Sequence, residues 1–191
     1  MMETKSIMIV GVGGQGTLLA SRIIGNTVIA EGYDVKVSEV HGMSQRGGSV
    51  VTYVRYGEKV CSPVIDKGGA DMILAFEPLE AMRALPYLKQ GGKLIVNTQQ
   101  IDPMPVITGA REYPANLCET LKAKADATVI DAAKLATEAG TIKAVNVVLI
   151  GVTAKNSGIE KEKWLTAIRS TVPPKFLDVN LKAFELGYAA G

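Results

Sequence analysis

A glycine-rich segment near the start of the sequence has the spacing of an anion-binding turn. Gly11–Gly16 (GVGGQG) matches the pattern G-x-G-x-x-G and directly follows a short apolar run. In such a turn the first glycine allows a tight bend, the second lets an anion approach the backbone, and the third lets a helix pack close to a strand. The N–H groups of the following helix would then face a phosphate or pyrophosphate. The residues assigned to this contact are Gly11, Gly13, Gly14, Gln15 and Gly16.

The alternative is that these glycines only allow the strand and the helix to pack. The dinucleotide interpretation needs an acidic residue at the end of the second strand, where its carboxylate binds a ribose hydroxyl. Glu39 stands at about that position, whereas Asp34 comes too early.

A polar loop flanked by glycines, His41–Gly48 (HGMSQRGG), follows Glu39. We expect it to meet the glycine turn at the carboxyl edge of the strands, which would place His41, Ser44, Gln45 and Arg46 around the same crevice. The planar guanidinium of Arg46 suits a phosphate or carboxylate, although the same residue could be a solvated loop cation. His41 has no Asp or Cys partner in the sequence around it and is more often a structural hydrogen bonder than an acid or base. We therefore assign no catalytic residue.

Two further polar segments follow predicted strands. Glu77–Glu80 (EPLE) comes after the strand that ends at Phe76, and Asn97–Gln100 (NTQQ) follows the next strand. Both are expected at the same carboxyl edge, although Pro78 and Glu80 also suit the first turn of a helix. The sequence contains no G-x-S-x-G, H-E-x-x-H or Walker-type G-K-[ST] motif, so the hydrolase and nucleotide-triphosphatase classes lose most of their support.

The elements that must position these residues alternate along the chain. The apolar run Lys5–Val10 is typical of a strand buried on both faces. Apolar residues then recur at helical spacing from Gly14 to about Gly32, and Asp34–Val40 alternates like a second strand, which together predict a right-handed strand–helix–strand unit. Ser49–Tyr56 is predicted to turn into Lys59–Cys61 as a hairpin.

Further strands and helices complete the pattern. Strands are predicted at Asp71–Phe76 and Lys93–Asn97, and helices at Glu80–Leu88, Asp131–Glu138, Ala144–Lys155, Glu160–Ser170 and Lys175–Ala189. A short alternation of strand and helix is predicted through Val106–Thr108, Ala115–Lys124 and Thr128–Ile130. The last helix has one apolar stripe, Leu177, Leu181, Phe184 and Tyr188. The fold class predicted for the single domain 1–191 is α/β: a Rossmann-like open, mostly parallel sheet with helices on both faces and an inserted antiparallel hairpin.

Composition excludes several classes. Apolar residues make up 47% and charged residues 21% of the 191 residues, which excludes disordered and fibrous proteins. The charge of +2, without a long basic run, argues against a nucleic-acid partner. The two cysteines, Cys61 and Cys118, cannot form a four-thiolate cluster and are expected as buried thiols, and His41 is the only imidazole for zinc. We expect no cluster and no catalytic zinc on this chain.

The apolar segments are too short for export or membrane insertion. The run Ile7–Val10 has four strongly apolar residues, whereas a secretory segment needs roughly 7–15 and a membrane span about 20. The two widely separated cysteines also do not resemble a secreted disulfide framework. We therefore expect a cytoplasmic protein without membrane contact.

Longer motifs resemble one known family. Four segments are similar to the beta subunits of indolepyruvate ferredoxin oxidoreductases, within the wider family of 2-oxoacid:ferredoxin oxidoreductase gamma subunits: Ile9–Gly16, Ser38–Val50, Leu74–Ala81 and Asn180–Tyr188. The resemblance runs from Ile7 to Tyr188. Gamma subunits of the pyruvate branch usually carry a loop richer in arginine and proline at the position of His41–Gly48, so the resemblance favours the arylpyruvate branch.

The resemblance implies oxidative decarboxylation of an arylpyruvate such as indolepyruvate to the aryl-acetyl-CoA. In this family thiamine diphosphate with magnesium attacks the ketone, and [4Fe-4S] clusters carry electrons to ferredoxin. The resemblance implies that the larger alpha subunit holds these cofactors, and the present sequence, which lacks a G-D-G…N thiamine signature and cluster cysteines, agrees with that division. This chain would be the subunit without a cofactor, inactive alone, and its crevice would contact coenzyme A or substrate.

Other classes remain open. One is a gamma-type subunit of a pyruvate or other 2-oxoacid:ferredoxin oxidoreductase. Another is a stand-alone Rossmann-type protein that binds NAD(P) or a flavin, and a third is a cofactor-sensing module. For a subunit, the interface is expected at the hairpin Ser49–Cys61, the loop His41–Gly48 or the C-terminal helix, although that helix could instead dock on its own sheet.

Overall fold

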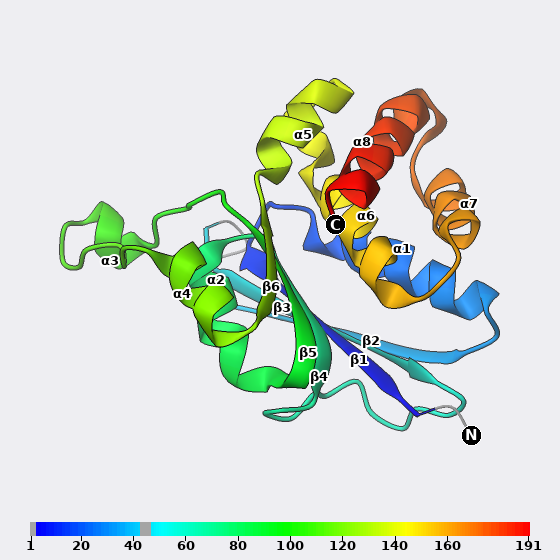
Figure 1. The fold of residues 1–191 in the computed structure, drawn as a ribbon, viewed down its shortest axis with the longest axis horizontal. Helices are drawn as coiled ribbons and strands as arrows, with labels where there is room; N and C mark the ends of the chain where they lie inside the picture. The colour runs from blue at the N-terminus through cyan, green and yellow to red at the C-terminus, as the bar shows by residue number, and fades with distance from the viewer. Residues whose placement is uncertain (1–2, 43–46) are drawn as a thin grey trace.

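A six-stranded sheet forms the centre of the protein in the computed structural model, which describes residues 3–42 and 47–191 (Figure 1). The strands, in chain order, are β1 (Lys5–Val12), β2 (Asp34–His41), β3 (Ser49–Gly57), β4 (Ala70–Ala75), β5 (Leu88–Asn97) and β6 (Asp126–Ile130). Their spatial order is β2-β3-β1-β4-β5-β6. The pairs β1–β4, β4–β5 and β5–β6 are parallel, whereas β3 is antiparallel to both β1 and β2. The predicted mostly parallel sheet with an antiparallel insertion is confirmed.

The hairpin consists of different strands from those predicted. β3 pairs with β2, from Asp34 opposite Gly57 to His41 opposite Val50, and not with Lys59–Cys61, which lies outside the strands. β3 therefore separates β2 from β1, and the predicted strand–helix–strand unit is not made of adjacent strands. The alternating pattern of β2 suits an edge strand, and a short connection brings β3 back antiparallel beside it.

Helices cover both faces of the sheet (Figure 1). They are α1 (Thr17–Ala30), α2 (Pro78–Ala84), α3 (Met104–Ile107), α4 (Leu117–Lys124), α5 (Ala132–Ala139), α6 (Val145–Ser157), α7 (Lys161–Thr171) and α8 (Leu177–Ala190), with 3-10 turns at Leu85–Tyr87, Ile142–Ala144 and Pro174–Phe176. The helices α1 and α6 pack on one face, with α5, α7 and α8 around them, and α2 and α4 pack on the other. No helix in the described part of the chain has the length and apolar character needed to cross a membrane.

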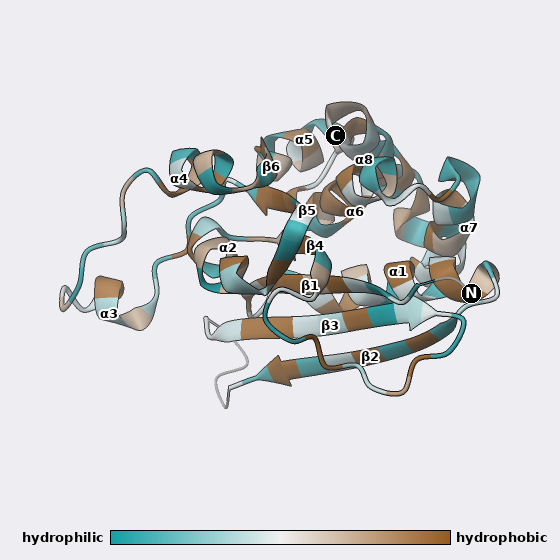
Figure 2. Ribbon diagram, turned by 60° about the horizontal axis from the view of Figure 1, so that its bottom comes forward, coloured by the Kyte–Doolittle hydropathy of each residue, from teal (hydrophilic) through white to brown (hydrophobic). Residues whose placement is uncertain are grey.

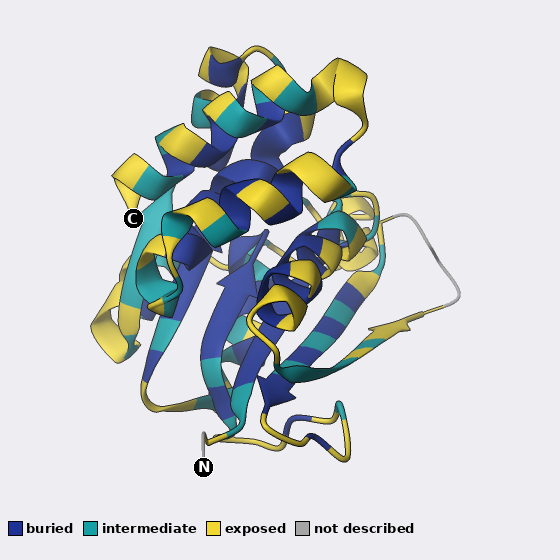
Figure 3. Cartoon of the chain, turned by 90° about the vertical axis from the view of Figure 1, so that its right-hand side faces the viewer, coloured by how far each residue is buried: buried dark blue, intermediate teal, exposed yellow. Residues whose placement is uncertain are grey.

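Two hydrophobic clusters lie on opposite faces of the sheet. Ile7 and Ile9 of β1 belong to the cluster with α1 and α6, whereas Met8 and Val10 belong to the cluster with α2 and α4. Successive side chains of a strand point to opposite faces, so a strand covered on both sides needs a continuous apolar run. Figure 3 shows this contrast between the mostly buried central strands and the edge of the sheet, where no residue of β2 is buried and half are exposed.

The helices α6 and α8 contact each other through their backbones. A Cβ atom at Gly187 would lie 1.9 Å from the carbonyl oxygen of Val148, and one at Gly151 would lie 2.3 Å from that of Phe184. The predicted apolar stripe on the last helix is confirmed, since Phe184 is buried in the core and Leu177, Leu181 and Tyr188 are half-buried against the same cluster. The buried residues of α8 are Asn180, Ala183, Phe184 and Gly187.

Candidate functional site

The glycine turn joins β1 to α1 in a conformation that requires glycine. Gly14 and Gly16 have φ angles of 101° and 86°, in the left-handed region where a Cβ atom is strained. A Cβ atom at Gly16 would also lie 2.7 Å from Nδ2 of Asn146, which donates a hydrogen bond to the Gly16 carbonyl at 3.4 Å. Gly16, the third glycine of the motif, therefore allows α6 to pack close to the turn.

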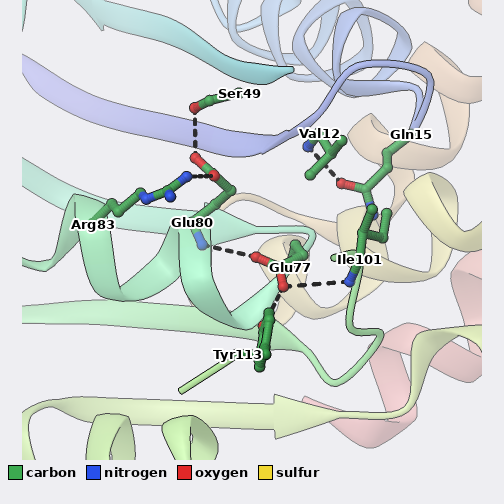
Figure 4. Close-up of polar contacts among 8 residues, drawn as sticks. All are labelled: Val12, Gln15, Ser49, Glu77, Glu80, Arg83, Ile101 and Tyr113. Atoms are coloured by element: carbon green, nitrogen blue, oxygen red, sulfur yellow. Dashed lines mark hydrogen bonds and ion pairs between the residues drawn. The ribbon is translucent and has the colours of Figure 1, made fainter. Parts of the chain in front are cut away.

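Gln15 fastens the turn to the end of β4. Its Oε1 accepts a hydrogen bond from the N–H of Val12 at 2.7 Å (Figure 4). Its Nε2 donates to the carbonyl of Phe76 at 3.1 Å. A Cβ atom at Gly11 would lie 2.8 Å from Oε1 of Gln15, so Gly11 leaves the space that this side chain occupies. Gln15 thus supports the turn from within the protein, and a direct contact with a ligand stays a prediction.

The loop after β2 meets the glycine turn, as predicted. The N–H of Gly13 donates to the carbonyl of Gly48 at 2.8 Å, and the N–H of Gly47 donates to the carbonyl of Gly13 at 3.4 Å. This pairing uses the N–H of Gly13, so an anion would be bound by other N–H groups of the turn and of α1. Ser44, Gln45 and Arg46 lie outside the described residues, and their part in the crevice stays a prediction.

One pocket of about 390 Å³ brings the glycine turn and the end of β2 together. The first turn of α1 opens on it through Thr17 and Leu18. The first N–H groups of a helix have no intrahelical acceptor, and the N-cap residue Gly16 has no side chain to supply one. The pocket therefore presents helix N–H groups and their partial positive charge to an anion. Its lining residues are Gly13, Gly14, Gly16, Thr17, Leu18, Glu39, His41 and Val50.

Glu39 lies in this pocket but not where a dinucleotide-binding protein has its acidic residue. Glu39 is opposite Thr52 of β3, and Thr52 is opposite Ile9 of β1, so Glu39 is two strands from β1. With about 4.8 Å between neighbouring strands, this adds roughly 5 Å to the expected separation. Its Oε2 accepts a hydrogen bond from Thr52 Oγ1 at 3.2 Å. The inserted β3 therefore removes the geometry on which the ribose contact was predicted.

His41 lines the same pocket from the exposed end of β2. Its Nδ1 lies 2.9 Å from the carbonyl oxygen of Gly42, the next residue along the chain. The side chain is exposed, and this local contact agrees with the interpretation of His41 as a structural hydrogen bonder.

Glu77 lies at the carboxyl edge of β4 but is occupied by contacts within the protein. It is 1% exposed and caps α2 by accepting a hydrogen bond from the N–H of Glu80 at 2.9 Å (Figure 4). Its other oxygen accepts from the hydroxyl of Tyr113 and from the N–H of Ile101, the latter at 3.5 Å. Burial first, and then the hydrogen bond to Glu77, raise the pKa of the Tyr113 hydroxyl above its ordinary value. The alternative of a helix start is therefore the correct one for Glu77.

Glu80 and Asn97 are also structural. Glu80 accepts from the hydroxyl of Ser49 at 2.5 Å and forms an ion pair with Arg83 at 2.5 Å. Asn97 is fully buried, and its side chain donates to the carbonyl of Phe76 at 3.2 Å and accepts from the N–H of Ala132 at 3.1 Å. These side chains connect the ends of neighbouring strands and hold the crevice edge in place.

The prediction for the cysteines is wrong for Cys61, which is exposed in the irregular segment after β3. Cys118 is half-buried, and burial raises the pKa of its thiol. Within residues 3–42 and 47–191, no group of three or more His, Cys, Asp and Glu side chains is placed to hold a metal ion.

Sequence reasoning missed Asn146 and Tyr113. Asn146 interrupts the apolar run of α6, and a polar residue at such a position is a signal that could have been used. Tyr113 lies in a connection with no periodic pattern, so nothing in the sequence pointed to its bond with Glu77.

The structure is that of an α/β protein of the Rossmann-like kind with a crevice beside the glycine turn at the carboxyl edge of the sheet. Residues 6–190 match the family model described as pyruvate ferredoxin/flavodoxin oxidoreductase. The chain therefore belongs to that family.

Individual relatives agree with this membership. The chain is 46% identical to indolepyruvate oxidoreductase subunit IorB of Thermococcus kodakarensis, over 99% of this chain and 96% of the relative. It is 29% identical to ketoisovalerate oxidoreductase subunit VorA of Methanothermobacter marburgensis, over 95% of this chain but 35% of that longer relative. Among solved structures, the gamma subunit of a keto/oxoacid ferredoxin oxidoreductase from Geobacter sulfurreducens superposes with a TM-score of 0.73 at 25% identity, covering 97% of each chain.

Proposed function

We propose that this chain is a subunit of a heteromeric, ferredoxin-dependent oxidoreductase that oxidatively decarboxylates arylpyruvates such as indolepyruvate to the aryl-acetyl-CoA. The supporting observation is the identity over nearly its whole length to a protein named indolepyruvate oxidoreductase subunit IorB. The chain is inactive alone in this proposal, and the complex is cytoplasmic.

The proposal assigns the redox chemistry to a larger alpha subunit. Thiamine diphosphate with magnesium supplies the nucleophile for the 2-oxoacid when it is bound there, and [4Fe-4S] clusters pass the electrons to ferredoxin. The two cysteines of this sequence support the division, because a [4Fe-4S] cluster needs four thiolates.

The crevice beside the glycine turn is the proposed contact with coenzyme A. Its volume of about 390 Å³ lies toward the small end of ligand pockets, so it would accept a diphosphate and an adjoining group but not the whole molecule. The N-terminus of α1 favours the negative charge, and Arg46 is proposed as a further counter-charge. Calorimetry of the complex with coenzyme A tests this role, since unchanged affinity in Arg46→Ala and Gly13→Val variants would contradict it.

The experiment that tests the function is co-expression with the candidate alpha chain. We expect the co-purified complex to reduce a viologen dye in the presence of indolepyruvate and coenzyme A, whereas each chain alone is inactive. Dye reduction by this chain alone, or no reduction by the complex, would contradict the proposal. Pyruvate and ketoisovalerate, tested in parallel, distinguish the arylpyruvate branch from other 2-oxoacid oxidoreductases.

A stand-alone NAD(P)- or flavin-binding protein is the weaker alternative. Its acidic ribose ligand would be Glu39, which lies two strands from β1 because β3 is inserted between β1 and β2. Fluorescence titration of the purified chain with NADH distinguishes this class, since micromolar affinity would favour it.

A further inference from the structure

The connection between β5 and α4 projects from the body of the protein as an arm (Figures 1 and 2). It runs from Asn97 to Leu117 and contains the single-turn helix α3. This connection exceeds the roughly 12–15 residues above which loops of a compact domain are uncommon and usually functional. We call residues 101–113 the β5–α4 arm.

One buried carboxylate oxygen closes the base of the arm. Oε1 of Glu77 accepts the N–H of Ile101, where the arm leaves the body, and the hydroxyl of Tyr113, where the arm returns (Figure 4). Because Glu77 is 1% exposed and its other oxygen caps α2, this attachment point is fixed to the sheet edge.

Contacts within the arm also define its shape. The N–H of Arg111 donates to the carbonyl of Pro105 at 2.9 Å, and the hydroxyl of Thr108 donates to the carbonyl of Met104 at 3.0 Å. Pro103 and Pro105 restrict the backbone on either side of Met104. The arm is therefore organised before it meets a partner, which lowers the entropic cost of binding.

The tip of the arm exposes two large apolar side chains. Met104 and Ile107 are 64% and 65% exposed, more than any other large apolar residue in the described part of the chain. They stand three positions apart on α3, a spacing that places both on one side of a helical turn. The charged residues of the arm are Asp102, Arg111 and Glu112, so its charge is nearly balanced. Such a tip fits an apolar groove and not a charged surface.

We infer that the β5–α4 arm is a docking element for the catalytic partner subunit, and that Met104 and Ile107 bind in an apolar groove on that subunit. The inference rests on the proposed function. The relative VorA supports a different polypeptide as the occupant over a second copy of this chain, because there the counterpart of this chain is the smaller part of a longer polypeptide. In the proposed complex the two are separate subunits, so contacts must hold this chain to its catalytic neighbour.

The position of the arm connects docking with the crevice. Glu77 follows Phe76, whose carbonyl accepts the hydrogen bond from Gln15 of the glycine turn. The base of the arm and the crevice therefore share the carboxyl edge of the sheet. A partner held by the arm lies on the side of the protein where the crevice opens.

The test compares a tip variant with a matched control in the full chain. The tip variant is Met104→Asp/Ile107→Asp, and the control is Ile29→Asp/Ile142→Asp, which changes residues that are 58% and 56% exposed elsewhere. Association with the alpha chain is measured by analytical ultracentrifugation, and thermal unfolding of each isolated variant is followed by circular dichroism. We expect the tip variant to raise the Kd at least about 100-fold. The control should stay within about threefold of the wild type, with both variants folded.

A third variant tests the base of the arm. Tyr113→Phe removes the hydroxyl donor and leaves the tip intact, and we expect it to raise the Kd by about tenfold through loss of preorganisation. Equal binding by the tip variant and the wild type would overturn the inference while the proposed function stands. Failure of the wild-type chain to bind the alpha chain overturns both. Self-association of the wild type that the tip variant abolishes would assign the arm to a second copy and also overturns the inference.

Discussion

Replacing Gly187 by alanine should destabilise the protein although alanine is the better helix former. A Cβ atom there would lie 1.9 Å from the carbonyl oxygen of Val148, far inside the roughly 3.5 Å of ordinary contact. The obstacle is backbone, so α8 must move away from α6. Overpacking costs about 1–3 kcal/mol where side chains can adapt, and backbone contact places this site at the upper figure, about 3 kcal/mol. Alanine returns at most about 1 kcal/mol through helix propensity. The net loss is about 2 kcal/mol.

Gly25→Ala in α1 is the matched control for this substitution. No atom outside the local helix backbone lies within 4 Å of a Cβ at Gly25, so only the propensity gain applies and we expect stabilisation by about 0.5–1 kcal/mol. Urea unfolding followed by circular dichroism measures both, and thermal midpoints should fall by about 4–8 °C for Gly187→Ala and rise for Gly25→Ala. A Gly187→Ala protein as stable as the wild type would refute the backbone contact between α6 and α8.

Three further substitutions test other parts of the structure. Gly16→Ala places a Cβ atom at φ 86° and should cost about 1–3 kcal/mol in urea unfolding, together with a measurable loss of coenzyme A affinity in the complex. Burial raises the pKa of Tyr56 from 10.0 to about 12. The protonated hydroxyl therefore contributes stability that is fully present below pH 10 and is lost as the pH rises to about 12. Between pH 10 and 11 the wild type should lose about 1 kcal/mol more than Tyr56→Phe, and equal losses in the two proteins would contradict this assignment. Asn97→Ala leaves the buried N–H of Ala132 without its acceptor and should cost about 2–3 kcal/mol, whereas the exposed neighbour Thr98→Ala should change stability by less than about 0.5 kcal/mol.

The sequence predicted the strands and helices well because most have a clear period. The run Lys5–Val10 is continuous because β1 is covered on both faces, and the helical spacing after Gly14 gave α1 close to its observed bounds. The spacing of apolar residues does not indicate which strands are neighbours in the sheet, so the insertion of β3 between β1 and β2 was not predicted. Lys59–Cys61 was assigned to a hairpin because Gly57 and Glu58 form a turn signal, but β3 already has β1 and β2 as its two neighbours.

The candidate site was predicted where it depends on backbone conformation. Gly16 allows the close packing that its position in the motif predicted, and the loop ending at Gly48 meets Gly13 as expected. Side-chain roles were harder to predict, because a polar residue after a strand can face a ligand or cap the next helix equally well. Glu77 and Asn97 each accept a hydrogen bond from the first turn of the next helix. Only the packing around these two side chains determines whether they face a ligand or the helix.

The position of β1 in the sheet has a consequence for biosynthesis. β1 leaves the ribosome before both of its neighbours, β3 and β4, so its second edge has no partner until the chain has been made as far as Ala75. Until then an apolar segment with an open edge must be kept from pairing with other nascent chains. The formation of the crevice is subject to the same delay, because Gln15 is fastened to the carbonyl of Phe76 and the turn gains that support only after β4 has joined the sheet.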